Sequence, residues 1–321
     1  MQPATRVAIL GTGLIGSSIG LAIKAVRPQT QIVGYDASGD NLRRAQGLKA
    51  IDRRASLRDA LADTDLVVVS VPVGSMKALF EEMAPLLPVQ ALVMDTGSSK
   101  ARVLEWAADL LPNGVRFVGG HPMAGKTETG PDAADAKLFQ GAVWCLAPLP
   151  STQRDAIDEA VRVVESMGAA PYFLDPHEHD GLVASVSHLP YLMAVALIGH
   201  LGREQSWRET ASLAAGGFGY ATHLSDSDPQ MFADIMRSNR DNIVRRLDLY
   251  IGELESLRDA VAADSPALKQ QFARAQSLHQ DWLAGRAQGQ PSEADNPLPT
   301  TRSMLTGSLF GRLGREKDKE R

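Results

Sequence analysis

The 321-residue chain has one cysteine, few aromatic residues and no excess of basic ones. The single cysteine, Cys145, cannot form an intramolecular disulfide, and its place in the apolar run 142–147 indicates a buried packing role. Lysine and arginine number 33 against 38 aspartates and glutamates, for a net charge of -5. No basic face is therefore expected for a nucleic-acid backbone, and small molecules are the expected partners.

The sequence also lacks the patterns of a metal centre, a secretion signal and a membrane span. The one pair of histidines at ligand spacing, His177 and His179, stands at an expected helix start, where such residues are more often solvated, so no metal is expected. An expected strand begins almost at the N-terminus, without the basic and apolar regions of a signal peptide. We expect no charge-free apolar stretch of membrane-spanning length, and hence a cytoplasmic protein without a membrane partner.

Short apolar runs alternate with helix-period segments over residues 1–174, as in a parallel sheet wrapped by helices. Several runs are apolar throughout, which is typical of strands covered on both faces. The expected strands are 7–10, 31–35, 65–70, 91–94, 115–118, 142–147 and 171–174. The expected helices are 14–26, 40–46, 75–86, 101–110 and 152–167. The pattern predicts a doubly wound α/β domain.

Residues 175–287 instead contain long helical segments with few strand signals. The expected helices are 178–202, interrupted at Pro190, then 207–215, 229–262 and 267–287. The run 191–198 is apolar on all sides, which favours burial in a bundle or at a subunit contact. We therefore expect an all-helical dimerisation domain covered by a second copy of the chain. Residues 288–321 combine Pro, Ser and Thr with a terminal charge run and are expected to form a largely disordered tail.

A glycine-rich motif of the form G-x-G-x-x-G follows the first expected strand directly and opens the first helix. Gly11 allows the tight turn, Gly13 lets the backbone approach a pyrophosphate, and Gly16 lets the helix pack on its strand. Free N–H groups at the helix start, around Leu14 and Ile15, then hold the phosphate charge. This context, first strand to first helix, predicts a Rossmann-type dinucleotide site.

Asp36 ends the second expected strand, about 20 residues beyond the glycine motif, where a carboxylate can bond both ribose hydroxyls and repels a 2′-phosphate. NAD is therefore favoured over NADP. Two alternatives stay open. Asp36 could cap the following helix, and Arg43 and Arg44 could reach a 2′-phosphate.

Polar and apolar residues that follow other strands should meet at the carboxyl edge of the sheet, where open α/β sheets bind ligands. Val71 and Pro72 follow the strand 65–70 and are expected to line the cofactor's path. Ser98 follows 91–94 and His121 follows 115–118, the histidine between glycines that let a ligand approach closely. Either could have a plain structural role, Ser98 as a helix cap and His121 as a hydrogen-bonded loop residue.

One motif of the helical half is expected to reach the same crevice. Pro190 should kink its helix and present Ser187 and His188 towards the crevice, although such a kink is more often only a packing feature.

In this order the motifs resemble those of the prephenate/arogenate dehydrogenase family of tyrosine biosynthesis. The matching pieces are 11–16, 95–100, 119–125, 187–190, 216–218 and 227–229. They span nearly the whole chain except the tail. The resemblance implies a Rossmann domain followed by a helical dimerisation domain, and NAD(P)-dependent oxidative decarboxylation of a cyclohexadienyl acid, prephenate or arogenate, without a metal.

The resemblance also implies roles for individual residues. His121 bonds the 4-hydroxyl of the substrate and takes its proton as hydride leaves the same carbon, while Ser98 orients both groups. Ser187 is a further serine of the substrate site. The new ketone-like centre withdraws electrons across the ring, carbon dioxide departs, and the ring becomes aromatic.

The chain departs from the family at two positions. Tyr191 stands where many members have a second histidine, which arogenate-using relatives often lack as well. His223 stands where many have an arginine that clamps the substrate carboxylate, and an imidazole cannot copy a guanidinium fork. The candidate substitutes are His223 itself, Lys126, Arg237 and Arg240. We favour Arg240, expected on a helix facing the pocket, with a surface ion pair to Asp241 or Asp234 as the alternative.

Three other functions remain possible on the sequence. The two departures suit a dehydrogenase for a variant ring such as 4-amino-4-deoxyprephenate. A β-hydroxyacid dehydrogenase shares the two-domain plan but needs a lysine in the helical half, and none is evident there. A non-catalytic NAD-binding sensor or scaffold could use residues 289–321 as its interaction element.

Overall fold

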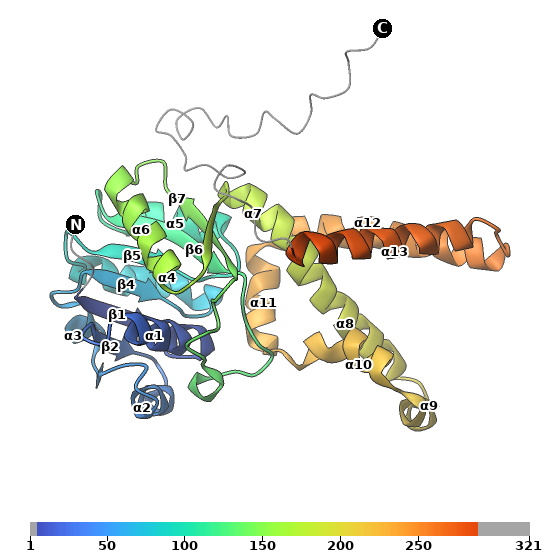
Figure 1. Ribbon diagram of the computed structural model, residues 1–321, viewed down its shortest axis with the longest axis horizontal. Coiled ribbons are helices and arrows are strands. Elements are labelled where there is room, and N and C mark those ends of the chain that lie inside the picture. The colour runs from blue at the N-terminus through green and yellow to red at the C-terminus, as the bar shows by residue number, and fades with distance from the viewer. Residues whose placement is uncertain (1–4, 288–321) are drawn as a thin grey trace, which may run out of the picture.

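The computed structural model describes residues 5–287, and its N-terminal part is built on one eight-stranded sheet (Figure 1). The strands are β1 (Arg6–Leu10), β2 (Gln31–Tyr35), β3 (Arg53–Arg54), β4 (Leu66–Val69), β5 (Leu92–Asp95), β6 (Arg116–Pro122), β7 (Val143–Pro148) and β8 (Ala170–Phe173). Their order is β3-β2-β1-β4-β5-β6-β7-β8. The crossover that places β1 beside β4 is the switch point of a doubly wound sheet, so the predicted fold class is confirmed.

We expected a sheet that is parallel throughout, and in this respect the prediction was wrong. β7 runs antiparallel to β6, because an apolar run reports burial and carries no information on strand direction. β6 also extends four residues past its expected end at Val118, to Pro122. His121 therefore lies within a strand, paired with Cys145 of β7, and not in a loop.

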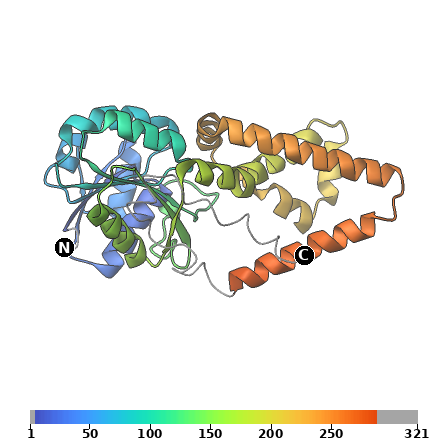
Figure 2. The ribbon, with the colours of Figure 1, turned by 90° about the horizontal axis from the view of Figure 1, so that it is seen from above.

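Helices cover both faces of this sheet, as Figure 2 shows from above. They are α1 (Leu14–Val26), α2 (Gly39–Gly47), α3 (Leu57–Leu61), α4 (Val73–Met83), α5 (Ala101–Leu110) and α6 (Arg154–Ser166). Neighbouring strand residues point to opposite faces, so Ile9 belongs to the core with Trp144 and Leu10 to the core with Phe80. The short elements β3 and α3 were not predicted. We call β1–β8 with α1–α6 the sheet domain.

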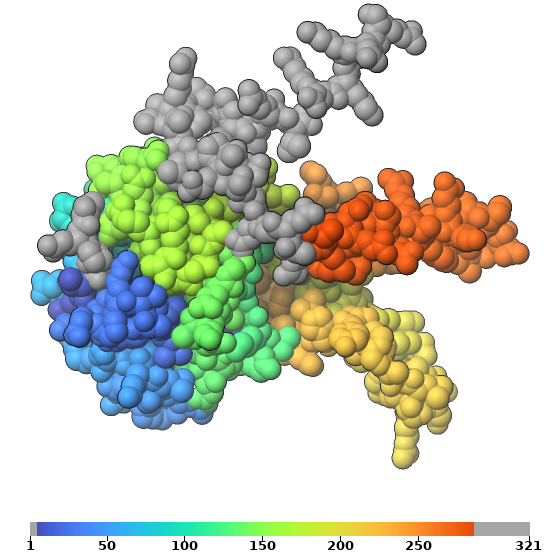
Figure 3. Space-filling view, in the orientation of Figure 1, coloured from blue at the N-terminus to red at the C-terminus, as the bar shows by residue number. Residues whose placement is uncertain are grey.

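The elements that follow β8 form the helical domain. They are α7 (Pro176–Val183), a π-helical turn (Ala184–His188), α8 (Leu189–Leu201), α9 (Trp207–Leu213), α10 (Gly216–Thr222), a 3₁₀ turn (His223–Asp226), α11 (Pro229–Ser238), α12 (Arg240–Ala262) and α13 (Leu268–Ala287). α8 to α10 and α12 with α13 form two arms that point away from the sheet domain (Figures 1 and 3).

Two expectations for these helices were wrong. Pro190 does not interrupt α8, because the irregular turn is the π turn before it. Pro190 falls in the first turn of α8, where its missing N–H has no intrahelical partner to lose. The expected helix 229–262 is broken at Asn239, whose side chain bonds the Asp180 carbonyl oxygen at 2.8 Å and His188 Nδ1 at 3.2 Å. These hydrogen bonds join Asn239 to residues distant in the sequence, so the local pattern could not predict the break.

The helical domain has a small core of its own. Among the described residues it joins Ala184, Tyr191, Phe232, Ile235 and Ile243. Large apolar side chains of α8, α12 and α13 stay exposed in the single chain, among them Val195 at 38%, Leu249 at 60% and Trp282 at 54%. A domain with so much apolar surface is short of a covering partner.

One helical stretch, Pro176–Leu201, could cross a bilayer by length and composition alone, because it contains an 18-residue window with a mean hydropathy of 1.8, of which 28% is buried. We expected no such stretch, and on this criterion that expectation is wrong. His179, Asp180 and His188 lie within it, are buried, and bond to groups of other elements. This is the arrangement of a helix packed in a folded protein, so the criterion is weak evidence for a membrane span.

Candidate active site

The turn between β1 and α1 has the form of a phosphate-binding loop. Gly11 has a φ of +96°, and a Cβ there would collide with the Ser70 carbonyl oxygen. A Cβ at Gly16 would collide with the Gly11 carbonyl oxygen. A Cβ at Gly13, in contrast, would meet no atom within 4 Å. The first and third glycines thus allow close packing, and the second faces open space that a pyrophosphate can fill.

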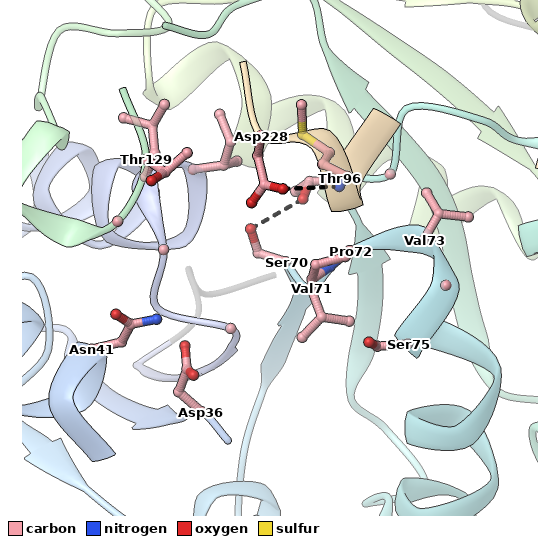
Figure 4. A pocket seen from close by; sticks show the side chains of 18 of the residues that line it. Asp36, Asn41, Ser70, Val71, Pro72, Val73, Ser75, Thr96, Thr129 and Asp228 are labelled. Carbon is pink, nitrogen blue, oxygen red and sulfur yellow. Dashed lines mark hydrogen bonds between the residues drawn. The ribbon is translucent and has the colours of Figure 1, made fainter. Parts of the chain in front are cut away.

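A cavity of about 860 Å³ opens at this turn, along the carboxyl edge of the sheet. It is lined by most of the residues predicted to bind the cofactor: Gly11, Gly13, Leu14, Ile15, Asp36, Val71 and Pro72. Ser98 and Lys126 line it as well, together with Ser227, Asp228, Met231 and Ile235 of the helical domain. Figure 4 shows Asp36 and Asn41 together in one part of the cavity, and Ser70, Thr96 and Asp228 gathered in another. The site therefore has walls from both domains.

Asp36 faces the cavity while also holding the glycine turn. Its Oδ2 accepts hydrogen bonds from Thr12 N at 2.7 Å and Thr12 Oγ1 at 3.0 Å, and its Oδ1 accepts one from Ser38 N at 2.8 Å. The helix-capping role considered for Asp36 belongs to Ser38, whose side chain accepts from Asn41 N. These three bonds use three of the roughly four lone-pair sites of a carboxylate, which leaves one on Oδ1 for a ribose hydroxyl.

Arg43 and Arg44, the two candidates for a 2′-phosphate, are engaged elsewhere. Arg43 pairs with Asp40 at 2.9 Å, and Arg44 pairs with Asp40 and with Asp132, each at 2.8 Å. Neither arginine is among the cavity's lining residues.

His121 is buried near the end of β6, one strand over from the strand that leads to Ser98. Its Nδ1 lies 2.9 Å from His179 Nε2 of α7. Among the hydrogen bonds of the described residues, none joins His121 to Ser98. The buried serine beside it, Ser99, bonds Ser238 Oγ of α11 at 2.9 Å.

The sequence had suggested that His179 is solvated, and this was wrong. His179 is fully buried, and its Nδ1 lies 2.8 Å from Asp180 Oδ1. Asp180 accepts two further bonds from backbone N–H groups at the start of α5, those of Lys100 and Ala101. The adjacent His179 and Asp180, in a helix that Asp175 caps, were the only local sign of a role for His179. Its partner His121 is 58 residues away in the sequence, so the contact could not be predicted from the local pattern.

A buried ion pair lies beside the histidines. Lys100 Nζ contacts Asp95 Oδ2, and both side chains are fully buried. Asp95 also accepts from Gly97 N at 2.7 Å and Gly120 N at 3.1 Å, which ties the start of α5 to β6. Burial lowers the pKa of His121 well below its usual range, and His179 and the Lys100 ammonium lower it further. At neutral pH His121 is therefore uncharged and able to accept a proton.

The predicted residues of the helical domain lie around these groups in different ways. Ser187 is half-buried in the π turn. His188 is fully buried, and burial lowers its pKa to about 4. Tyr191 stacks on Phe232, with ring centroids 3.5 Å apart and planes within 3°. Tyr191 thus packs in the domain core.

The four candidates for binding a substrate carboxylate separate in the structure. His223 is exposed and its Nδ1 donates to the Tyr220 carbonyl oxygen. Arg237 pairs with Asp234, and Arg240 pairs with Asp241 at 3.0 Å, the surface ion pair considered as its alternative. Lys126 is the one of the four that lines the cavity, with its Nζ donating to the Ala133 carbonyl oxygen at 2.9 Å.

No group of three His, Cys, Asp or Glu residues is placed to hold a metal ion in the part of the chain that the structure describes.

Family models match the chain on both sides of residue 174. Residues 19–172 match the nucleotide-binding domain of prephenate dehydrogenase, and residues 175–274 match the dimerization domain of prephenate dehydrogenase.

Individual proteins of known name are also similar. A prephenate dehydrogenase of Bacillus subtilis is 32% identical, over 90% of this chain and 78% of its own. A cyclohexadienyl dehydrogenase of Zymomonas mobilis is 36% identical, over 84% of this chain and 94% of its own. Among solved structures, prephenate dehydrogenase from Aquifex aeolicus in complex with hydroxyphenyl propionate and NAD+ superposes with a TM-score of 0.81. It is 26% identical, over 86% of this chain and 98% of its own.

Proposed function

The chain belongs to the prephenate dehydrogenase family, and we propose that it catalyses NAD-dependent oxidative decarboxylation of prephenate to 4-hydroxyphenylpyruvate, or of arogenate to tyrosine. The observation that carries the proposal is an uncharged, buried histidine, His121, on the strand next to the one that leads to Ser98. Ser98 in turn lines the cavity that opens at the dinucleotide loop, whereas His121 itself is not one of the lining residues. We place the reaction in tyrosine biosynthesis in the cytoplasm.

NAD fits the cavity better than NADP. Gly13 leaves open space for the pyrophosphate beside the N–H groups of Leu14 and Ile15, and Asp36 faces the ribose position. A 2′-phosphate would meet that carboxylate, and Arg43 and Arg44 are paired with aspartates. When bound, NAD+ accepts the hydride from the substrate carbon that carries the 4-hydroxyl.

His121 acts as the general base in this reaction. Its free ring nitrogen takes the proton of the 4-hydroxyl, so that loss of hydride leaves a carbonyl at that carbon. The bond between the carboxylate carbon and the ring carbon opposite this carbonyl then breaks. The electron pair of that bond completes the aromatic ring, and carbon dioxide leaves. His121 can return the proton to the phenolate oxygen, so the histidine ends the cycle uncharged.

Ser98 and Lys126 are the proposed substrate contacts of the sheet domain. Ser98 lines the cavity one strand from His121 and can bond the hydroxyl that His121 deprotonates. Lys126 supplies a cation for a substrate carboxylate, since His223 and Arg240 are turned to other partners. From the helical domain, Ser187 and His188 remain proposed contacts.

We further propose that the domains divide at residues 174 and 175 and that two chains associate through residues 175–287. β8 ends at Phe173, and Asp175 caps α7 with bonds to two backbone N–H groups. The apolar faces of α8, α12 and α13 supply the surface for a second copy. The sensor alternative is set aside because the chain's relatives are dehydrogenases.

The decisive experiment is to follow NADH formation with prephenate and with arogenate, each with NAD and with NADP. We expect turnover with at least one acid and a preference for NAD. His121→Asn should lower kcat by about 10²–10⁴-fold, the usual contribution of a general base, while NAD still binds. Unimpaired turnover in His121→Asn would overturn the assignment of the base.

Tyr191 and His223 favour testing a third substrate, 4-amino-4-deoxyprephenate. Neither side chain offers the usual family contact, because Tyr191 packs on Phe232 and His223 bonds the Tyr220 carbonyl oxygen of α10. Faster turnover of the amino compound than of both other acids would transfer the assignment to that variant ring.

A further inference from the structure

We propose that His179 and Asp180 form a positioning pair that decides which ring nitrogen of His121 acts as the base. The inference rests on the proposed function and deepens it, since it assigns a task to two residues of the helical domain. Its basis is the line of hydrogen bonds from the start of α5 through Asp180 and His179 to His121.

The line begins at an ionised carboxylate. Asp180 Oδ1 accepts from Lys100 N at 2.7 Å, and its Oδ2 accepts from Ala101 N at 3.0 Å. These are free N–H groups at a helix start, where the helix dipole also favours negative charge. Asp180 is therefore an acceptor only, and His179 Nδ1, 2.8 Å from its Oδ1, must carry a proton.

The next step follows from the count of protons on a neutral imidazole. Burial lowers the pKa of His179, so the ring is uncharged at neutral pH and has one N–H, already committed to Asp180. His179 Nε2 is then an acceptor. Across the 2.9 Å contact, His121 Nδ1 must be the donor.

His121 is also neutral, so a proton on Nδ1 leaves Nε2 with a free lone pair. Nε2 is thus the atom that takes the substrate proton. When it does so, the new positive charge is held by an unbroken line to the Asp180 carboxylate. The logic is that of a catalytic triad, in which a third group orients the base, except that here a second histidine stands between base and carboxylate.

The substitutions that test the pair are both at His179. Phenylalanine fills a similar space but cannot accept a bond, so His179→Phe frees His121 to adopt either tautomer. Glutamine can accept from His121 with its oxygen and donate to Asp180 with its amide, so His179→Gln restores the line. His177→Phe is the matched control, because His177 is exposed two residues away on the same helix.

We expect His179→Phe to lower kcat by about 10- to 100-fold, the usual effect of losing a group that orients a ligand or base, with the substrate KM and NAD affinity within about twofold of wild type by the same reasoning. His179→Gln should recover most of the loss, and His177→Phe should match wild type. A purely structural role would instead weaken substrate binding, NAD binding and thermal stability together. Turnover of His179→Phe equal to that of wild type would overturn the proposal.

Nitrogen NMR of the full-length wild-type protein, with histidine labelled at both ring nitrogens, provides a second measurement that needs no turnover. The signals are assigned with His121→Asn and should show His121 protonated at Nδ1, with the resonance changed in His179→Phe. A proton on Nε2 in wild type would overturn the proposal even in an active enzyme. Absence of NADH formation from any cyclohexadienyl acid would overturn the proposed function and leave the NMR result to decide the pair.

Discussion

The sheet domain and the helical domain bury their side chains in different ways. The sheet domain has an apolar core on each face, with Phe80, Phe117 and Trp144 almost completely enclosed. The helical domain encloses a small cluster around Tyr191 and Phe232 and leaves long apolar faces open. The first domain therefore has a complete core within one chain, whereas the second needs apolar contact with another surface.

Separating the two domains should have the largest effect. Expressed alone, residues 1–174 should unfold in one cooperative transition with a free energy in the usual range of about 5–15 kcal/mol. Residues 175–287 should show no cooperative transition at low concentration, because their own core is small. Thermal unfolding followed by circular dichroism and sedimentation measures both. A monomeric helical fragment that unfolds cooperatively would remove the distinction.

A smaller effect is expected from one charge placed on each domain. Val195 of α8 and Val89 of the sheet domain are both exposed in the single chain, at 38% and 83%. Val195→Asp should raise the dissociation constant of the dimer by at least about tenfold, since it places a charge in an apolar contact and removes part of the about 1.5–3 kcal/mol that burial of a whole valine side chain supplies. Val89→Asp should leave the mass in solution unchanged. Sedimentation over a concentration series checks this, and equal behaviour of the two variants would place the subunit contact elsewhere.

A third prediction concerns acid and the buried His188 of the helical domain. Burial lowers the pKa of His188 to about 4, with Asp180 opposing and His179 adding to the shift. Between the ordinary histidine pKa near 6.5 and about 4, the unfolded chain binds a proton at His188 that the folded chain does not. The contribution of His188 to the free energy of unfolding is therefore complete above pH 6.5 and decreases as the pH is lowered from 6.5 to 4. The loss is about 1.4 kcal/mol per pH unit and about 3 kcal/mol at most.

The variant for this test is His188→Gln, which cannot titrate. Between pH 6.5 and 4 the unfolding free energy of this variant should decrease less steeply with falling pH than that of wild type. The difference in slope should correspond to at most about one bound proton. His200→Gln, at an exposed histidine near the end of α8, the helix that follows the π turn, should keep the wild-type slope. Urea unfolding at several pH values measures the slopes, and identical curves for wild type and His188→Gln would contradict the shift.

Most of the sheet domain could be predicted from the sequence, because the patterns that indicate its strands and helices are local. Each long strand of the sheet is an apolar run between turn residues, and the glycine motif sits where the first strand meets the first helix. The order of the motifs also identified the family correctly. The direction of β7 was missed, since both faces of a buried strand are apolar in either orientation.

Contacts between distant segments could not be predicted in this way. Asn239 ends α11 with bonds to Asp180 and His188, and nothing in its immediate sequence announces them. His179 resembles its exposed neighbour His177 in sequence, yet only His179 meets His121 in the fold. The roles of Ser98, Lys126, Arg240 and the other site residues stay predictions until substrate kinetics are measured.

The bond between His121 and His179 has a consequence for recombination between genes of this family. A crossover between Phe173 and Pro176 falls between two folded units and spares both of their cores. It would nevertheless take His121 from one parent and the acceptor of its Nδ1 from the other. We therefore expect chimaeric chains joined between residues 173 and 176 to fold and to bind nucleotide. Where the α7 of one parent packs differently on the α5 of the other, they should lose turnover, because the acceptor for His121 Nδ1 is displaced.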